Sequence, residues 1–355
     1  MASMKVQPIV TTKNSSFFTQ HVENLERKGV NFSTVSATDV ATSAGTSTTR
    51  FGGWKVCSAT EVATSAGKSF DETWIPSTWL PSFGHNIGYY LYASTKFYPQ
   101  ILSRSLREDV DLVHAYSGLT LPFALAQPTR PLVVTFIGSD LMGDYLFGMF
   151  PAIAKRCANR ADAVIVQNEQ MATQLECETH IIPNGVDFEF FEPIPRGVAV
   201  EEVGWDQDAS HILFPYGTDR AVKNYELAES VAEMVISESS KDVHFHHLGD
   251  VLYEKMPYYM NAADVVLITS KREGSPNTVK EALACNTPVV STDVGDVRER
   301  VANVQGSMVN SSIPQLVDGV LTALNTEDCN GREEVRDVSW DAVSADILEV
   351  YKKVL

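Results

Sequence analysis

The sequence predicts an α/β protein with two domains, each built on a parallel β-sheet with helices on both faces. The chain has 355 residues, more than one ordinary domain of about 100–200 residues contains. Hydrophobic residues make up 44% of the chain and charged residues 21%, which is typical of a globular protein. Short apolar runs alternate with helical patterns, and because this alternation occurs twice, we expect two separate sheets.

The first half of the chain carries the pattern of the first domain. Short apolar runs predict strands at residues 5–10, 32–36, 111–114, 132–136, 163–166 and 180–182. Helical periodicity predicts helices at residues 19–28, near 89–106 and at 151–159. Strands separated by helices in this way favour parallel pairing.

The second half repeats the alternation. Apolar runs predict strands at residues 212–214, 243–246, 265–268 and 289–291. Helices are predicted near residues 225–237, 251–262 and 277–284, and a last helix at 341–354 would close the chain. This half is therefore expected to form its own sheet and core.

The boundary between the two domains is predicted from a stretch rich in Pro and Gly. Residues 184–202 include Pro193, Pro195 and Gly197 and have no clear period, so they are the best linker candidate. We therefore expect domains over residues 1–190 and 191–340, with the terminal helix of residues 341–355 packing back towards the first domain.

An internal repeat interrupts the first domain. Residues 36–47 (SATDVATSAGTS) recur as residues 58–69 (SATEVATSAGKS), with ten of twelve positions identical at an offset of 22. Segments this rich in Ala, Ser, Thr and Gly cannot stack into a core, so we expect residues 36–73 to form a mobile insertion, with an acceptor-binding flap as the alternative. The aromatic segment 74–92 follows, and is interpreted as a core-capping loop and helix, or alternatively as an apolar acceptor groove or weak peripheral membrane contact.

Composition also excludes several classes of protein. The formal net charge is −17, so phosphate backbones are repelled and no nucleic-acid partner is expected. The five cysteines are widely spaced without a CxxC pair, which indicates reduced thiols and neither a disulfide framework nor a thiolate metal site. No leader pattern or long apolar run is present, so we expect a cytoplasmic protein, with the inner membrane face as a peripheral alternative.

The most informative stretch for chemistry is residues 270–299. Glu273 follows a predicted buried strand, at the edge where open α/β sheets bind ligands. Ser275 is expected to cap a helix whose first residue is Pro276. The backbone amides near Asn277 and Thr278 would then face the crevice, and such a helix end attracts a phosphate.

A second carboxylate lies on the same helix. Glu281 is five residues beyond Pro276, about 8 Å along the helix axis, so the two acids would bracket a phosphate. Glu273 could accept hydrogen bonds from a sugar and Glu281 from a ribose. Asn286 is predicted to adopt the left-handed conformation that ends the helix, and Gly295 to allow close approach of a ligand.

The pattern EGSPNTVKEALACNTPVVSTDVGDVRE resembles the signature of the retaining GT-B glycosyltransferases of family four, in which two glutamates separated by seven residues hold a nucleotide-sugar. The segments IIPNGVD (181–187) and LFPYGTDRAVKN (213–224) resemble the hinge of that family and its strand and loop that contact the donor diphosphate. DLVHAYS (111–117) and LVVTFIGSD (132–140) resemble two strands of its first domain. The resemblance covers nearly the whole chain outside residues 38–86.

This resemblance implies two Rossmann-like domains facing across a cleft, with the donor on the second domain and the acceptor on the first. It implies catalytic roles for Glu273, Arg220 and Lys223, and Arg and Lys beside a diphosphate are chemically sensible. Donor-binding residues implied in the same way are Glu281, Gly274, Ser275, Asn277, Thr278, Gly249 and Gly217. No metal and no cofactor is expected, because the basic pair and the helix end can neutralise the departing diphosphate.

The chain departs from the family in two places. Many members have a histidine in the loop that here reads residues 137–140 (IGSD), and Asp140 is a candidate substitute. His114 is either a ligand-facing residue or a buried strand-end histidine. The paired glycines of the first loop are replaced by residues 12–16 (TKNSS), where Ser15 and Ser16 are candidates to cap the first helix and offer amides to a ligand.

Two metal-like patterns are interpreted as structural. Residues 244–247 read His-Phe-His-His, but neighbours on a strand point to opposite faces and no carboxylate lies at metal spacing, so sheet histidines are expected. The acids Asp109 and Asp111 merely precede a strand of the first domain. Neither pattern is expected to bind a metal.

The predicted function is metal-independent transfer of a sugar, with retention, from a nucleotide-diphosphate-sugar to a glycan, lipid-linked or small-molecule acceptor. Closure about the linker would exclude water, whose attack competes with transfer. The alternatives are a non-catalytic nucleotide-sugar or glycan-binding subunit with the same fold, which the missing histidine and glycines favour, and an epimerase acting on a nucleotide-sugar.

Overall fold

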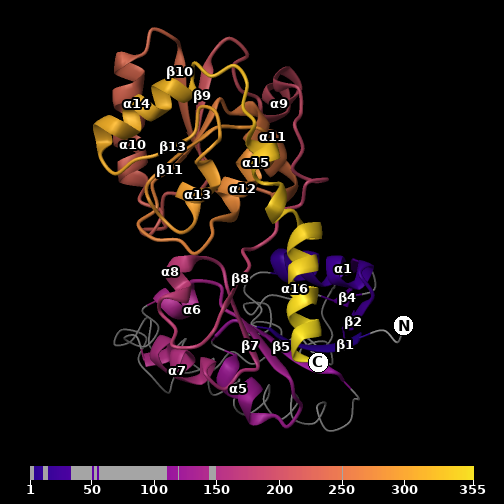
Figure 1. The fold of residues 1–355 in the computed structure, drawn as a ribbon. Coiled ribbons are helices and arrows are strands. Elements are labelled where there is room, and N and C mark those ends of the chain that lie inside the picture. The colour runs from indigo at the N-terminus through magenta and orange to yellow at the C-terminus, as the bar shows by residue number, and fades with distance from the viewer. Residues whose placement is uncertain are drawn as a thin grey trace, which may run out of the picture. The chain divides into compact units, whose positions relative to one another are not determined.

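The protein folds as two compact units (Figure 1). The computed structural model describes residues 4–10, 15–32, 50–51, 54–55, 110–118, 120–143, 149–249 and 251–355. Unit 1 comprises Met1–Ile182 and Ser344–Leu355, and unit 2 comprises Pro183–Val343. The division therefore falls between residues 182 and 183, earlier in the chain than the boundary expected at 190.

Unit 1 is built on a parallel sheet that has six strands among the described residues, in the order β2-β1-β5-β6-β7-β8. The strands are β1 (Met4–Val10), β2 (Val30–Phe32), β5 (Leu112–Tyr116), β6 (Leu132–Thr135), β7 (Ala163–Val166) and β8 (His180–Ile181). The helices are α1 (Ser15–Arg27), α5 (Leu121–Ala126), α6 (Ser139–Met142), α7 (Met149–Ala158) and α8 (Glu169–Ala172). A short antiparallel pair, β3 (Arg50–Phe51) with β4 (Trp54–Lys55), lies outside this sheet.

The core of unit 1 forms because its central strands are apolar on both faces. Every residue of β5, β6 and β7 is buried, as expected for parallel strands covered by helices. Ala154 and Ala158 of α7 and Leu121 of α5 pack against these strands. The predicted strands of this half are confirmed to within a few residues where the structure describes them.

Unit 2 has a second parallel sheet, with the order β10-β9-β11-β12-β13. The strands are β9 (Ser210–Phe214), β10 (Val243–His247), β11 (Val265–Ile268), β12 (Val289–Ser291) and β13 (Met308–Val309). The α-helices are α9 (Arg196–Val203), α10 (Tyr225–Glu238), α11 (Met256–Ala262), α12 (Asn277–Ala284), α13 (Val297–Val301), α14 (Ile313–Ala323) and α15 (Gly331–Glu334). Two 3₁₀ turns, η4 (Tyr253–Lys255) and η5 (Arg336–Val338), complete the unit.

Helices cover both faces of the second sheet. Helix α10 packs against α14, and α11 packs against α9 and α12, so two helix layers enclose the strands (Figure 1). All four residues of β11 at the centre are fully buried. The predicted class, two α/β domains with parallel sheets, is confirmed.

The linker expected over residues 184–202 is instead part of unit 2. Val186 accepts a hydrogen bond from the Trp340 amide and donates one to the Val338 carbonyl. Phe191 is fully buried in the core, and helix α9 occupies the end of the segment. Pro195 is the N-cap of α9. Pro193 and Pro195 therefore mark the start of helix α9. The segment lacks an apolar period because α9 buries only a small face, Ala199 and Val200.

The last helix, α16 (Trp340–Val354), crosses the division between the units, and residues 344–355 belong to unit 1. The Tyr351 side chain is fully buried and its hydroxyl lies 2.5 Å from His114 Nδ1. This contact ties the end of the chain to strand β5 over 237 positions of sequence.

Several predictions fall on other parts of the chain. The repeated segment 36–47 and 58–69, the aromatic segment 74–92, the helix near 89–106 and Cys57 lie outside the described residues. The cysteines that are described, at positions 157, 177, 285 and 329, are free thiols. None of the helices that the structure describes combines the length and apolar character needed to span a bilayer.

Candidate functional site

The basic residues predicted to meet a diphosphate lie in the loop after β9. That loop is held by buried Thr269, whose hydroxyl donates to the carbonyls of Lys223 and Asn224. Asn224 has φ 59 and is the N-cap of α10, so the chain turns sharply after Lys223. The lysine side chain is thereby directed into unit 2, where the residue is only 6% exposed.

Lys223 and Glu273 form a close ion pair. The lysine Nζ donates to Glu273 Oε1 at 2.6 Å and lies 3.8 Å from the centre of the Tyr216 ring. Burial lowers the pKa of Lys223, the Glu273 carboxylate partly offsets this, and the positive charge of Arg220 lowers it further. The Arg220 side chain itself is exposed. Lys223 and Glu273, predicted from separate motifs, therefore come together.

Helix α12 begins beside this pair, but not as expected. Its N-cap is Pro276 and its first residue Asn277, with no side chain capping the amides. The expectation that Ser275 caps the helix is wrong. Its hydroxyl instead donates to Asp296 Oδ2 at 2.8 Å, a charge-assisted hydrogen bond to a buried carboxylate.

The loop that carries Glu273 and Ser275 is held in place by hydrogen bonds from a buried lysine. Lys280 is fully buried and its Nζ donates to the Asn184 carbonyl at 2.7 Å and to Ser275 Oγ at 3.0 Å. Burial lowers the pKa of Lys280 to about 8. Among the described residues, Asn277 Oδ1 is a buried oxygen without a hydrogen-bond partner, at the open end of α12.

The second predicted glutamate is buried one turn further along α12. Glu281 is 8% exposed, and the Tyr253 hydroxyl donates to its Oε1 at 3.3 Å. Burial raises the pKa of Glu281 to about 7, although the Tyr253 hydrogen bond and the Lys280 charge oppose the shift. Burial raises the pKa of the Tyr216 hydroxyl, and the charges of Glu273 and Glu281 raise it further.

Three glycines shape the surroundings of this site. Gly295 has φ +57, and a Cβ there would lie 2.2 Å from the Gly274 carbonyl oxygen. The close approach predicted at Gly295 is therefore made by the loop of Glu273 itself. Gly217 and Gly249 follow β9 and β10 at the carboxyl edge of the sheet, and a Cβ on Gly249 would meet nothing within 4 Å.

Two family models match different parts of the chain. The model described as glycosyl transferases group 1 matches residues 216–326, which include the whole cluster around Lys223 and Glu281. The model described as glycosyltransferase family 4 matches residues 58–190. The chain belongs to the group 1, family-four glycosyltransferases.

Curated relatives of this glycosyltransferase family member are distant. A D-inositol 3-phosphate glycosyltransferase of Xylanimonas cellulosilytica is 30% identical over 210 residues, which are 48% of this chain and 50% of the relative. The chain thus spans about half the length of that relative.

Solved structures share the fold over nearly the whole chain. A sucrose-phosphate synthase from Thermosynechococcus elongatus aligns with a TM-score of 0.67 at 16% identity, covering 99% of this chain and 98% of the other. The Anabaena protein HepE in complex with UDP-glucose aligns with a TM-score of 0.65 at 14% identity, covering 99% and 100%. The family-four chain therefore has the GT-B fold, as predicted.

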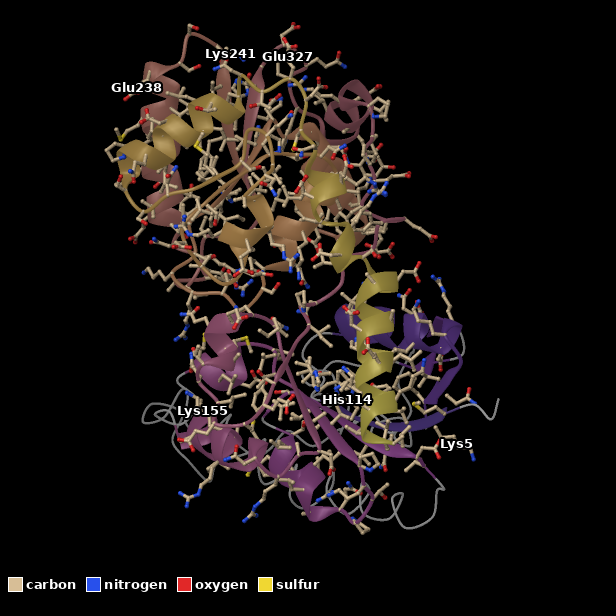
Figure 2. The ribbon with its side chains drawn as sticks, viewed as in Figure 1. Lys5, His114, Lys155, Glu238, Lys241 and Glu327 are labelled. Atoms are coloured by element: carbon tan, nitrogen blue, oxygen red, sulfur yellow. The ribbon has the colours of Figure 1, made fainter. Side chains whose placement is uncertain are left out.

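The sugar-side candidate on β5 is enclosed within unit 1 of this glycosyltransferase. His114 is fully buried, with Nδ1 2.5 Å from the Tyr351 hydroxyl and Nε2 2.8 Å from the Thr135 hydroxyl. Its ring stacks on Tyr116 with centroids 3.9 Å apart, and burial lowers its pKa well below the usual value. Figure 2 labels His114 beside helix α16. Of the two roles considered, the structure favours the buried strand-end histidine.

The candidate replacement for the family histidine is also buried. Asp140 is fully enclosed, and its carboxylate accepts hydrogen bonds from the amides of Gly118 at 2.6 Å and Ile137 at 3.0 Å. Burial raises the pKa of Asp140 while these amides oppose the shift. The carboxylate ties two loops at the carboxyl ends of β5 and β6. Ser15 and Ser16 are the first residues of α1.

Three residues of the candidate site were missed by the sequence analysis. Tyr216 lies against Lys223, Tyr253 donates to Glu281, and Lys280 supports the loop of Glu273. Only Lys280 had a local signal, since it is a charged residue in a helix flanked by buried strands. The tyrosines are brought in by tertiary packing alone.

Proposed function

We propose that this chain is a retaining glycosyltransferase that moves a sugar from a nucleotide-diphosphate-sugar to a glycan, a lipid-linked or a small-molecule acceptor. The observation that carries the proposal is the cluster at the carboxyl edge of the second sheet. There Lys223 contacts Glu273 and Tyr216, and Glu281 lies on the adjoining helix. Membership of the family supports the same reading.

The cluster matches the chemical parts of such a donor. The unpaired amides at the start of α12 and the cations of Lys223 and Arg220 suit a diphosphate, since both stabilise negative charge. Glu273 beside them suits the hydroxyls of the sugar, and Glu281 those of the ribose. A carboxylate accepts several hydroxyl hydrogen bonds at once.

The same groups would promote departure of the nucleoside diphosphate. When the glycosidic C–O bond breaks, charge builds up on the phosphate oxygen, and preorganised cations stabilise that charge without a metal. The sequence contains no carboxylate evidently placed as a covalent nucleophile. We therefore propose a front-face route, in which the departing phosphate oxygen takes the proton of the acceptor hydroxyl and the new bond forms on the same face.

The test begins with donor recognition. Calorimetric titration of the full chain with UDP, GDP and ADP should show one binding site for one of them, and Lys223→Met should weaken that binding at least tenfold. Lys271→Met is the matched control, because its exposed side chain carries the same charge in the neighbouring loop, which follows β11. Equal binding by both variants would contradict the proposal.

Catalysis is tested separately. The chain is incubated with the sugar form of the nucleotide that binds and with a panel of acceptors, and the anomeric configuration of the product is read by NMR. A product with the configuration of the donor supports retention, and an inverted product refutes it. Nucleotide binding without turnover of any donor and acceptor would instead favour the non-catalytic subunit.

A further inference from the structure

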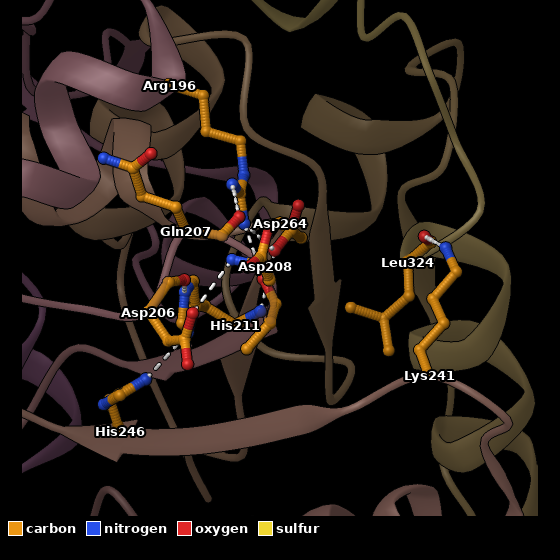
Figure 3. Close-up of polar contacts among 10 residues, drawn as sticks. Arg196, Asp206, Gln207, Asp208, His211, Lys241, His246, Asp264 and Leu324 are labelled. Carbon is orange, nitrogen blue, oxygen red and sulfur yellow. Dashed lines mark hydrogen bonds and ion pairs between the residues drawn. The ribbon is translucent and has the colours of Figure 1, made fainter.

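Three histidines gather on one face of the second sheet, away from the donor cluster. His244 and His246 lie two positions apart on the edge strand β10 and so share a face. His211 lies on the neighbouring strand β9, where its Cα pairs with that of His244. One nitrogen from each ring lies within 4.8 Å of the other two. Figure 3 shows His211 and His246 pointing toward each other.

The ring of His211 is already oriented for a ligand. Its Nε2 lies 2.7 Å from the backbone carbonyl oxygen of Asp206. A carbonyl can only accept, so Nε2 carries the hydrogen and Nδ1 keeps its lone pair. That Nδ1 faces His246 Nε2 at 3.1 Å. A carbonyl behind the far nitrogen is the arrangement that fixes the tautomer of metal-binding imidazoles.

The spacing of the nitrogens suits a small cation. Two imidazole nitrogens at about 2.0–2.1 Å from a tetrahedral zinc ion lie roughly 3.3 Å apart, and the observed pair is 3.1 Å apart. The third ring can adjust, because the side chain of His244 is 41% exposed. Its Nε2 lies 3.5 Å from Oδ1 of the exposed Asp242.

The surroundings favour a dication and hold the rings in place. His246 stacks on Trp205 with centroids 3.8 Å apart and planes at 10°. The His211 amide donates to Asp264 Oδ2 at 2.7 Å, so the backbone of this histidine is anchored as well as its ring. The carboxylates of Asp242 and Asp264 offset positive charge near the cluster, although Arg196 lies 3.4 Å from Asp264.

We propose that His211, His244 and His246 bind one Zn²⁺ ion, with water in the fourth position. Imidazole nitrogen is a preferred ligand of zinc and a poor one for Mg²⁺ or Ca²⁺. His211 and His244 are the second residues of β9 and β10, and His246 lies two residues further along β10, whereas Lys223 and Glu273 follow the carboxyl ends of β9 and β11. The ion would therefore link the edge strand β10 to β9 and stabilise the fold of unit 2, without a role in sugar transfer.

The test is calorimetric titration of tag-free full-length protein with ZnCl₂ at neutral pH. One site per chain is expected, with a higher unfolding temperature in the presence of Zn²⁺ and no such effect of MgCl₂. Replacement by Co²⁺ should give the visible absorption of a tetrahedral site. His246→Gln and the exposed His244→Gln should each lower the Zn²⁺ affinity at least tenfold.

His247→Gln is the matched control, because this histidine lies on the same strand but on the other face, against the ring of Tyr225. It should bind Zn²⁺ like the parent protein. Far-ultraviolet circular dichroism of each variant without metal verifies that it is folded. The proposal is overturned if the parent binds no Zn²⁺, or if folded His244→Gln and His247→Gln bind it equally well.

Discussion

Replacing Glu281 by Gln should stabilise the protein at alkaline pH while weakening donor binding. Burial raises the pKa of Glu281 from 4.5 to about 7. As pH rises from 4.5 to 7 the unfolded chain releases this proton before the folded chain does, so stability falls across that window and is constant above it. At about 1.36 kcal/mol per pKa unit, ionised Glu281 costs on the order of 3 kcal/mol above pH 7.

The Gln variant keeps the shape of the side chain and an oxygen for the Tyr253 hydroxyl, but carries no charge at any pH. Its thermal unfolding midpoint should therefore exceed that of the parent at pH 8, by about 2–4 °C for each kcal/mol in a unit of this size, and match it at pH 4.5. Glu299→Gln, which removes an exposed carboxylate from α13, is the matched control. Ribose hydroxyls bond more strongly to a charged acceptor, so nucleotide affinity should fall.

The difference in unfolding temperature between Glu281→Gln and the parent should be present at pH 8 and absent at pH 4.5. If Glu281→Gln and the parent unfold at the same temperature at pH 8, burial does not disfavour the ionised carboxylate. If the variant is destabilised equally at pH 4.5 and pH 8, the side chain acts through packing and not through charge. Unchanged nucleotide affinity would remove Glu281 from the proposed donor site without affecting the stability argument.

Two further predictions concern Gly295 in unit 2 and Asp140 in unit 1. Gly295→Ala should destabilise the chain by about 1–2 kcal/mol or more, because φ is +57 and the new Cβ meets the Gly274 carbonyl. Gly197→Ala is the control, because its Cβ meets nothing within 4 Å, and it should not destabilise the chain. Equal thermal unfolding midpoints for the two variants would refute the prediction. Asp140→Ala should lower the free energy of unfolding by about 2–4 kcal/mol, since two loop amides lose their acceptor. Urea denaturation measures this free energy. A loss below about 0.5 kcal/mol would show that the hydrogen bonds to Asp140 are not needed for stability.

Much of the candidate site could be predicted because its signals are local. The carboxyl ends of parallel strands meet at one edge, so Glu273 and Lys223 were both expected there, 50 positions apart. Asn286 was predicted to adopt the left-handed conformation and has φ 59, because a helix followed by Pro288 must end within two residues. Such features depend only on neighbours in the chain.

Other features could not be predicted because they depend on partners far away in sequence. Ser275 was expected to cap α12, but its hydroxyl donates a hydrogen bond to Asp296, which lies 21 positions later in the sequence. His114 was a candidate to face the sugar, but in the structure its ring is buried against Tyr351 of the terminal helix. In each case the local pattern was compatible with two partners, and folding supplied the competing one.

The amino-acid sequence by itself determined the alternation of strands and helices, the two units and the chemistry gathered around Glu273 and Glu281, because apolar period, prolines and charged residues act over a few neighbouring positions. Only the tertiary structure decided that Lys223 pairs with Glu273, that the segment after Pro183 packs inside unit 2, and that His211 joins two histidines of another strand. Strand order and register bring such residues together, and no short stretch of the chain contains that information.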